Sequence, residues 1–275
     1  MNYYNKFKGI IQTSAYCEQT ALSLAVACDL SYEDDLKILS STVESWNYTF
    51  KKFGQVVKNP DIDTQFFVMS NDENIVVVFR GSDSPRDWMA NFKISYHPGP
   101  LDETKAHEGF QDSLFPAVVS LTNAITSIGL DNKKLWITGH SVGGALSSLY
   151  AGMLVENGYD VYGVYTFASP RPGDSAFENC LKDVISGPHY RVVNTGDVIP
   201  HVPPEPFFSH SGLRVILKED VKEHSSDSWL SETTQALRLF AEQTLNRFDV
   251  GNNHSLSADD ESYIPRLIND FNRSN

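Results

Sequence analysis

The sequence has few cysteines and no long apolar run, and both absences narrow the class of protein. Its only cysteines are Cys17, Cys28 and Cys180, which give neither a disulfide framework nor the spacing of a cysteine metal site. No apolar run approaches the roughly 18 residues of a transmembrane helix, and the first residues lack the apolar core of a signal peptide. We therefore expect no transmembrane segment, no metal, and a location that is cytoplasmic or secreted without a visible signal peptide.

Basic residues are also scarce relative to acidic ones. The chain has 22 lysines and arginines and 35 aspartates and glutamates, which gives a net charge of -13. Such a surface repels nucleic acid and anionic membranes, so we expect neither as a charge-driven partner. We find no repeat, low-complexity tract or linker, and therefore predict one domain over residues 1–275. The sequence leaves the oligomeric state open.

Strand and helix patterns alternate along most of the chain and predict an α/β fold. The continuous apolar run at 75–79 is typical of a strand buried on both faces of a mainly parallel sheet. We expect strands at 63–70, 74–80, 135–138, 161–167 and 190–194 and within 207–217, and helices at 13–30, 33–53, 110–128, 144–156, 174–184 and 230–245. This order predicts a mainly parallel central sheet with helices on both faces.

One short segment places a serine between two glycines where a predicted strand meets a predicted helix. The segment is Gly-His-Ser-Val-Gly, residues 139–143. A serine on such a sharp turn is exposed for nucleophilic attack, and small residues two positions before and after it let the turn pack closely. The pentapeptide also occurs by chance, so a glycine-rich structural turn is the alternative. The flanking strand and helix favour Ser141 as a nucleophile.

A nucleophilic serine needs a histidine base and an acid that orients the base. In the α/β-hydrolase order, the acid and then the histidine follow the serine. Asp197 comes just after a predicted strand, where acids face the site in open α/β sheets, although a turn-forming role is the alternative. Four histidines follow it, and we select His254, on a Gly/Asn loop before the last helix, over His201, His210 and His224.

The segment after the strand at 74–80 suggests how an oxyanion would be held. Two backbone N–H groups are needed, and Val142, directly after the serine, should supply one. Gly81 permits close backbone approach, so Ser82 should supply the second, and its hydroxyl could brace the same oxyanion.

A short apolar helix is predicted next. Ser84 has the character of a helix cap and a proline follows it. We predict a lid at approximately 83–95, with an ordinary surface helix as the alternative. Its candidate substrate contacts are Trp88, Met89 and Phe92.

Taken together, these motifs resemble the class 3 lipases, the α/β-hydrolases typified by small filamentous-fungal triacylglycerol lipases. The matching segments, from about residue 60 to 265, include "VVVFRGSDSPRDWMANF", "HEGFQDSL", "LWITGHSVGGALSSLYA", "FASPRPGD", "RVVNTGDVIPHVPP", "SHSG" and "HSLSADDESYI". The resemblance implies the α/β-hydrolase fold with a short helical lid and a structural role for His107. It also implies the triad Ser141, Asp197 and His254 and the oxyanion donors Ser82 and Val142.

The chain departs from the secreted fungal members in showing neither leader nor disulfides, and in the extra residues "SADDE" between His254 and Tyr263. The expected activity is serine carboxylester hydrolysis through an acyl-enzyme, without a cofactor. We expect a triacylglycerol lipase or long-chain esterase, whose ester substrate is either in solution or at a lipid–water interface. A feruloyl esterase or phospholipase on the same scaffold is the second hypothesis. A catalytically silent lipase-like binding protein is the third.

Overall fold

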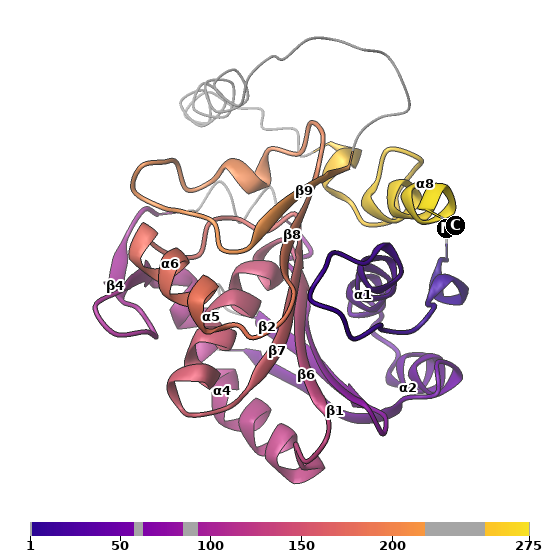
Figure 1. Ribbon diagram of the computed structural model, residues 1–275. Coiled ribbons are helices and arrows are strands. Elements are labelled where there is room, and N and C mark those ends of the chain that lie inside the picture. Colours follow the sequence, from indigo (N-terminus) through magenta and orange to yellow (C-terminus); the bar gives the residue numbers. More distant parts are fainter. Residues whose placement is uncertain (1, 58–62, 85–92, 218–250, 275) are drawn as a thin grey trace.

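The computed structural model describes residues 2–57, 63–84, 93–217 and 251–274, which build a central sheet between two helical layers (Figure 1). The seven strands lie in the order β1 (Thr49–Val57), β2 (Asp63–Ser70), β3 (Asn74–Phe79), β6 (Lys134–His140), β7 (Val161–Phe167), β8 (His189–Asn194) and β9 (Leu213–Leu217). The first three strands pair antiparallel, and the remaining pairings are parallel. The mainly parallel α/β fold predicted from the sequence is confirmed.

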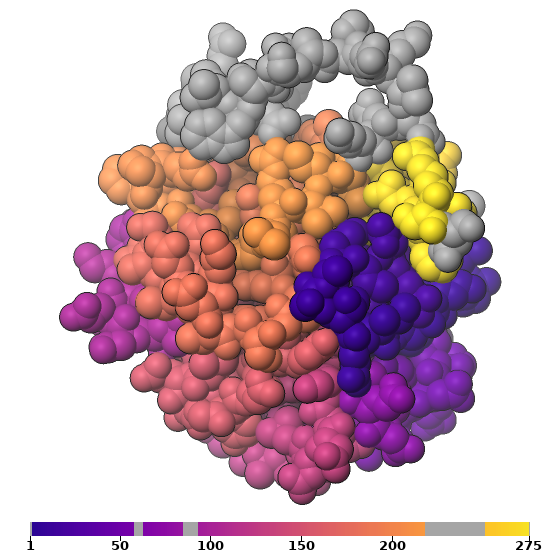
Figure 2. Space-filling model, viewed as in Figure 1, coloured from indigo at the N-terminus to yellow at the C-terminus, as the bar shows by residue number. Residues whose placement is uncertain are grey.

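Helices cover both faces of the sheet, also as predicted (Figure 1). One layer holds α1 (Glu18–Leu30), α2 (Leu36–Ser45) and α8 (Tyr263–Ser274), and the other holds α4 (Glu108–Ile128), α5 (Val142–Glu156) and α6 (Ser175–Val184). A small second sheet pairs β4 (Tyr96–Pro98) with β5 (Lys105–His107). The two ends of the chain meet, because α1 packs against α8, and Figure 2 shows the indigo N-terminal residues beside the yellow C-terminal ones.

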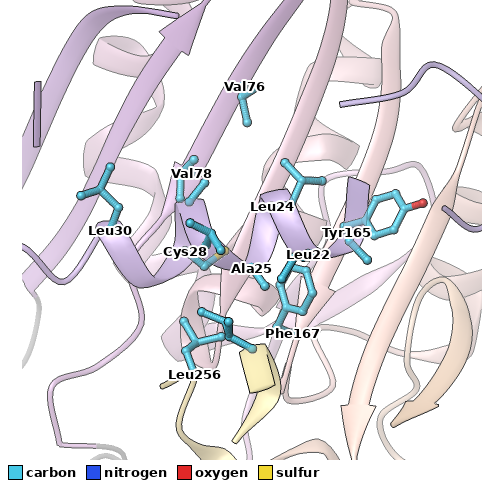
Figure 3. Close-up of a cluster of buried hydrophobic side chains, with 14 of the residues drawn as sticks. Leu22, Leu24, Ala25, Cys28, Leu30, Val76, Val78, Tyr165, Phe167 and Leu256 are labelled. Atoms are coloured by element: carbon cyan, nitrogen blue, oxygen red, sulfur yellow. The ribbon is translucent and has the colours of Figure 1, made fainter. Parts of the chain in front are cut away.

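Apolar side chains form one core on each face of the sheet. On the α1 side, apolar residues of the helix lie over Val76, Val78, Tyr165 and Phe167 (Figure 3). The intervening residues of β3 point the other way, into a core shared with α4 and α5. Every residue of β3 is buried, which explains why this strand reads as a continuous apolar run.

The structure corrects the helix predicted at 33–53. The helix α2 ends at Ser45, and β1 begins at Thr49. Between them, Asn47 takes a left-handed conformation with φ 62, which stops the helix. The strand β1 lies at the edge of the sheet with most side chains partly or fully exposed, so it lacks the apolar alternation by which a strand is recognised.

Other helix and strand boundaries differ less between the prediction and the structure. The first long helix begins at Glu18 rather than residue 13, and the strand within 207–217 occupies only Leu213–Leu217. The predicted helix at 230–245 lies outside the described residues.

Candidate active site

Ser141 occupies a strained turn between β6 and α5. Its backbone has φ 57 and ψ -131, a region that side-chain-bearing residues rarely adopt. The turn is held in place because the Ser141 N–H donates to the carbonyl of Phe167 on the neighbouring strand at 2.9 Å. Strain of this kind persists only where the surrounding structure enforces it, and such positions cluster at functional sites.

The glycines around Ser141 are required by close packing. A Cβ on Gly139 would lie 2.2 Å from the carbonyl oxygen of Gly143. A Cβ on Gly143 would lie 2.5 Å from the carbonyl oxygen of Phe79 in β3. Both distances are too short for a carbon atom, so the helix can approach the sheet only with glycine at these positions.

The structure brings together the three residues that the sequence places far apart. The Ser141 Oγ lies 2.9 Å from the Nε2 of His254, and the His254 Nδ1 lies 3.0 Å from each carboxylate oxygen of Asp197. Asp197 follows β8, and His254 ends a short 3-10 helix, Asn252–His254. Exposure of the three residues is 3% or less, so water is largely excluded from their hydrogen bonds.

The direction of these hydrogen bonds determines what the histidine can do. An ionised carboxylate only accepts hydrogen bonds, so His254 donates its Nδ1–H to Asp197. In the neutral ring, Nε2 then carries the free lone pair, and it faces the Ser141 hydroxyl. The arrangement therefore allows His254 to remove the serine proton.

A residue that the sequence analysis did not select completes the surroundings of the acid. The buried hydroxyl of Tyr263, from α8, donates to the Asp197 carboxylate at 2.7 Å and accepts the Asn194 N–H at 2.9 Å. The Ile199 N–H donates to the same carboxylate at 3.0 Å. Burial, followed by the charge of Asp197, raises the pKa of Tyr263 well above its usual value, so the hydroxyl stays a donor.

The loop that carries His254 is tied to the end of β8 through Asn194. The Asn194 side chain donates to the carbonyls of Asn253 and Glu261, at 2.9 and 2.6 Å. Arg266 of α8 in turn donates to the Asn194 side-chain oxygen at 2.6 Å. No local motif marks Asn194 or Arg266 as part of the site, because their partners are distant in sequence.

His140 braces the same loop from the other side. Its Nε2 donates to the His254 carbonyl at 2.8 Å, and its Nδ1 accepts the Tyr32 hydroxyl at 2.8 Å. Burial and then the proximity of His254 lower the pKa of His140 well below its usual value, so its ring is neutral. The contacts are those of a supporting residue.

The two segments expected to supply oxyanion donors lie beside the nucleophile. Val142 is the first residue of α5, where backbone N–H groups have no partner within the helix. A Cβ on Gly81 would lie 3.0 Å from the Ser141 Cβ, so the Gly81–Ser82 backbone passes next to the serine. The Ser82 hydroxyl accepts the Ser84 N–H at 3.2 Å.

The predicted lid contacts Trp88, Met89 and Phe92 lie outside the described residues. Just beyond them, the His107 Nε2 donates to the Lys93 carbonyl at 2.7 Å, and its ring packs against Phe110 and Phe208. Within the described ranges, no three His, Cys, Asp or Glu side chains could together hold a metal ion. No helix in the described part of the chain is long and apolar enough to cross a membrane.

Comparisons with known proteins agree with this geometry. The profile described as Lipase (class 3) matches residues 76–207, which include Ser141 and Asp197. A lipase of Rhizomucor miehei is 32% identical over 220 residues, which cover 74% of this chain and 54% of the relative. Both matches support assignment of the chain to the class 3 lipase family. The chain spans about half the length of the curated relatives that it matches.

Solved structures of lipases resemble this chain. The triacylglyceride lipase of Rhizomucor miehei superposes with a TM-score of 0.65 at 27% identity, over 77% of this chain and 84% of that one. A triacylglycerol lipase whose catalytic centre is described as a serine protease triad superposes with a TM-score of 0.64 at 27% identity, over 74% of this chain and 83% of that one. The α/β-hydrolase fold predicted for the chain is thereby confirmed.

Proposed function

We propose that this chain is a serine carboxylester hydrolase whose substrates are lipid esters. The observation that carries the proposal is the pair of contacts made by His254, at 2.9 Å to the Ser141 Oγ and at 3.0 Å to Asp197. A nucleophile, a base and an orienting acid in hydrogen-bonded sequence are the parts that acyl transfer requires. The similarity to a triacylglyceride lipase supports lipid esters as the substrate class.

In the proposed reaction, His254 takes the proton of Ser141 as the serine Oγ attacks the ester carbonyl. The N–H groups of Ser82 and Val142 stabilise the negative charge on the carbonyl oxygen. The protonated His254 gives its proton to the departing alcohol, which leaves an acyl group on Ser141. Water, activated by His254, then releases the fatty acid, and Asp197 stays ionised and stabilises the histidine cation throughout.

Within this class, we propose triacylglycerol or another long-chain glyceride as the substrate. Among the relatives, a protein of Fusarium solani named secreted mono- and diacylglycerol lipase 1 is 32% identical over 135 residues, 48% of this chain and 40% of that protein. A phospholipase is the second candidate. It is supported by the 28% identity, over 177 residues, to a rice protein named phospholipase A1-II 3, with 52% of this chain and 42% of that protein covered.

The test is hydrolysis of short- and long-chain p-nitrophenyl esters, emulsified triglyceride and phospholipid, with Ser141→Ala in parallel. Activity on long chains and emulsion that disappears in the variant supports the lipase. Release of fatty acid only from phospholipid supports the second candidate, and turnover of short or aromatic esters alone removes the lipase assignment. A folded protein that hydrolyses none of these esters and does not react with a fluorophosphonate contradicts the proposed function.

We also propose that residues 1–275 form one domain. This is supported by the large sheet, whose strands come from residues 49–217, and by the packing of α1 against α8. Limited proteolysis tests it, since one domain should give no stable subfragment that retains the fold.

A further inference from the structure

Two arginines lie side by side on the face of the sheet opposite α1. Arg191 of β8 is paired directly with Arg214 of β9, and neighbours in register on parallel strands point to the same face. Like charges placed side by side across strands are destabilising. The pair is unexpected in a chain with a net charge of -13, because acidic partners are plentiful in the sequence.

No acidic side chain in the described part of the chain is hydrogen-bonded to Arg191. Its guanidinium makes no hydrogen bond or ion pair with any described residue, and its Nε is buried without a partner. Arg191 is only partly buried, but a buried nitrogen without a hydrogen-bond partner is costly, so this Nε calls for a specific explanation.

A third arginine adds positive charge nearby but has its own partners. Arg171 donates to the carbonyls of His201 and Pro203, the latter at 2.7 Å, and to the carboxylate of Glu205 at 3.3 Å. These bonds fix Arg171 in place. The carboxylate of Glu205 is therefore bonded to Arg171, and it makes no hydrogen bond to Arg191.

The balance of charge around Arg191 is positive. Burial, then Arg214, then Arg171 lower the pKa of Arg191 to about 10, and the attractions of Glu178 and Glu205 are each weaker than either repulsion. The three arginines thus outnumber the two carboxylates that act on Arg191. An anion placed here would relieve the burial cost and the repulsion together.

A neighbouring histidine also lacks partners. His189 lies two residues before Arg191 on β8, so both side chains point to the same face. Both of its ring nitrogens are buried and have no hydrogen-bond partner in the described part of the chain. His189 and Arg191, which point to the same face of β8, therefore both carry buried nitrogen atoms without a hydrogen-bond partner.

We propose that Arg191 and Arg214 form a binding site for a phosphate group. Guanidinium groups present paired N–H donors that match the oxygens of phosphate, and two adjacent guanidiniums suit a group with several oxygens and more than one charge. The phosphate can be free or part of a lipid headgroup. This site does not use the triad and stands apart from the proposed ester hydrolysis.

The test titrates inorganic phosphate into the full chain by calorimetry and thermal unfolding, at constant ionic strength maintained with sodium chloride. Wild type should bind phosphate and melt at a higher temperature than in chloride alone. Arg191→Gln should lose at least about tenfold in affinity, the loss expected for charge-assisted hydrogen bonds. Without phosphate, this variant should be at least as stable as wild type, because it removes a partly buried charge that Arg214 and Arg171 repel.

A second variant keeps the test decisive if Arg191→Gln does not fold. Arg214 is exposed, so Arg214→Glu should fold, give Arg191 a carboxylate partner and abolish the phosphate response. The matched control is Arg273→Glu, the same charge change on the exposed part of α8, which should leave phosphate binding unchanged. The proposal would be overturned if wild type showed no binding of phosphate beyond the effect of chloride. It would also be overturned if Arg214→Glu bound phosphate as tightly as wild type.

The source of the phosphate is distinguished with a soluble short-chain phosphatidic acid in place of inorganic phosphate. A headgroup site is identified if the lipid binds more tightly than inorganic phosphate and if Arg214→Glu weakens this binding. Equal affinities, both sensitive to the variant, identify a free-phosphate site. Lipid binding unaffected by Arg214→Glu, together with no binding of inorganic phosphate, would overturn the site. Ser141→Ala should bind phosphate like wild type, so these outcomes are independent of whether the chain hydrolyses esters.

Discussion

The hydroxyl of Tyr263 lies 2.7 Å from the carboxylate of Asp197 and donates a hydrogen bond to it. The tyrosine belongs to the C-terminal helix α8, whereas the aspartate follows β8. The acid of the candidate triad is therefore positioned by a helix that packs against α1, on the opposite side of the sheet from α5. Correct alignment of His254 depends on the docking of α8 as well as on the loops around the site.

Replacing this tyrosine by phenylalanine should lower the rate of ester hydrolysis. Hydrogen bonds to charged groups contribute about 1.5–3 kcal/mol, so Tyr263→Phe should reduce kcat by about tenfold or more and leave KM nearly unchanged. The measurement is steady-state kinetics together with the rate of fluorophosphonate labelling. Tyr150→Phe is the matched control, because among the described residues its buried hydroxyl is hydrogen-bonded only to Thr122, at 3.2 Å. An equal fall of kcat in both variants would show that the effect is structural.

Ser82 should matter less through its side chain than through its backbone. A lost oxyanion donor costs about 3 kcal/mol of transition-state stabilisation. Ser82→Ala keeps the N–H and removes only a hydroxyl that accepts from Ser84, so its kcat should fall by much less than that of Ser141→Ala. Both variants are compared on one p-nitrophenyl ester, with circular dichroism to verify folding. Equal losses in two folded proteins would contradict the assignment.

A methyl group at Gly81 should disturb the site directly. A Cβ there would lie 2.3 Å from the Tyr32 hydroxyl and 2.7 Å from the His140 carbonyl oxygen. Gly81→Ala must therefore displace the segment that is proposed to carry an oxyanion donor, and we expect a loss of activity of about a hundredfold, the cost of one misplaced donor. Gly251→Ala is the control, since no atom of the described residues lies within 4 Å of its Cβ position. Wild-type kcat in Gly81→Ala would rule out this placement of the segment.

The sequence predicts the parts of the fold where the local pattern and the tertiary environment agree. The strands at 63–70 and 161–167 have the predicted bounds, because their apolar residues are those that the sheet buries. Residues 49–53 of the edge strand β1 are wrongly predicted as helix, since the exposed polar residues of this strand gain stability from pairing with β2 rather than from burial. Its identity as a strand depends on a neighbour that no short window contains.

The same distinction applies to the candidate site. Ser141 can be recognised from a local motif, because the turn requires glycines at a fixed spacing from the serine. Tyr263 and Asn194 have no such motif, since each is defined by contacts across the fold, to Asp197 and to the loop of His254. The roles assigned to Ser82, Val142 and the lid residues stay predictions, and their tests are activity measurements.

Buried histidines should make the protein sensitive to mild acid. Burial lowers the pKa of His107, His189 and His201 to about 4, and that of His140 and His210 well below its usual value. In the unfolded chain these rings titrate near 6.5. The unfolded state therefore binds more protons below that pH, and the stability that the neutral rings provide is complete above about pH 6.5 and lost as the pH falls toward 4.

The free energy of unfolding, measured with urea between pH 7.5 and 4.5 in buffers without phosphate, should fall steeply below about pH 6.5. Each such histidine contributes up to about 1.4 kcal/mol per pH unit. His189→Leu should reduce the slope by about one proton, because it removes one ring that must stay neutral in the fold. His97→Gln is the control, since His97 is half exposed and pairs with Glu108 at the surface. An identical slope in wild type and His189→Leu would mean that His189 is protonated in the folded protein, and its buried ring nitrogens would then need an anionic partner.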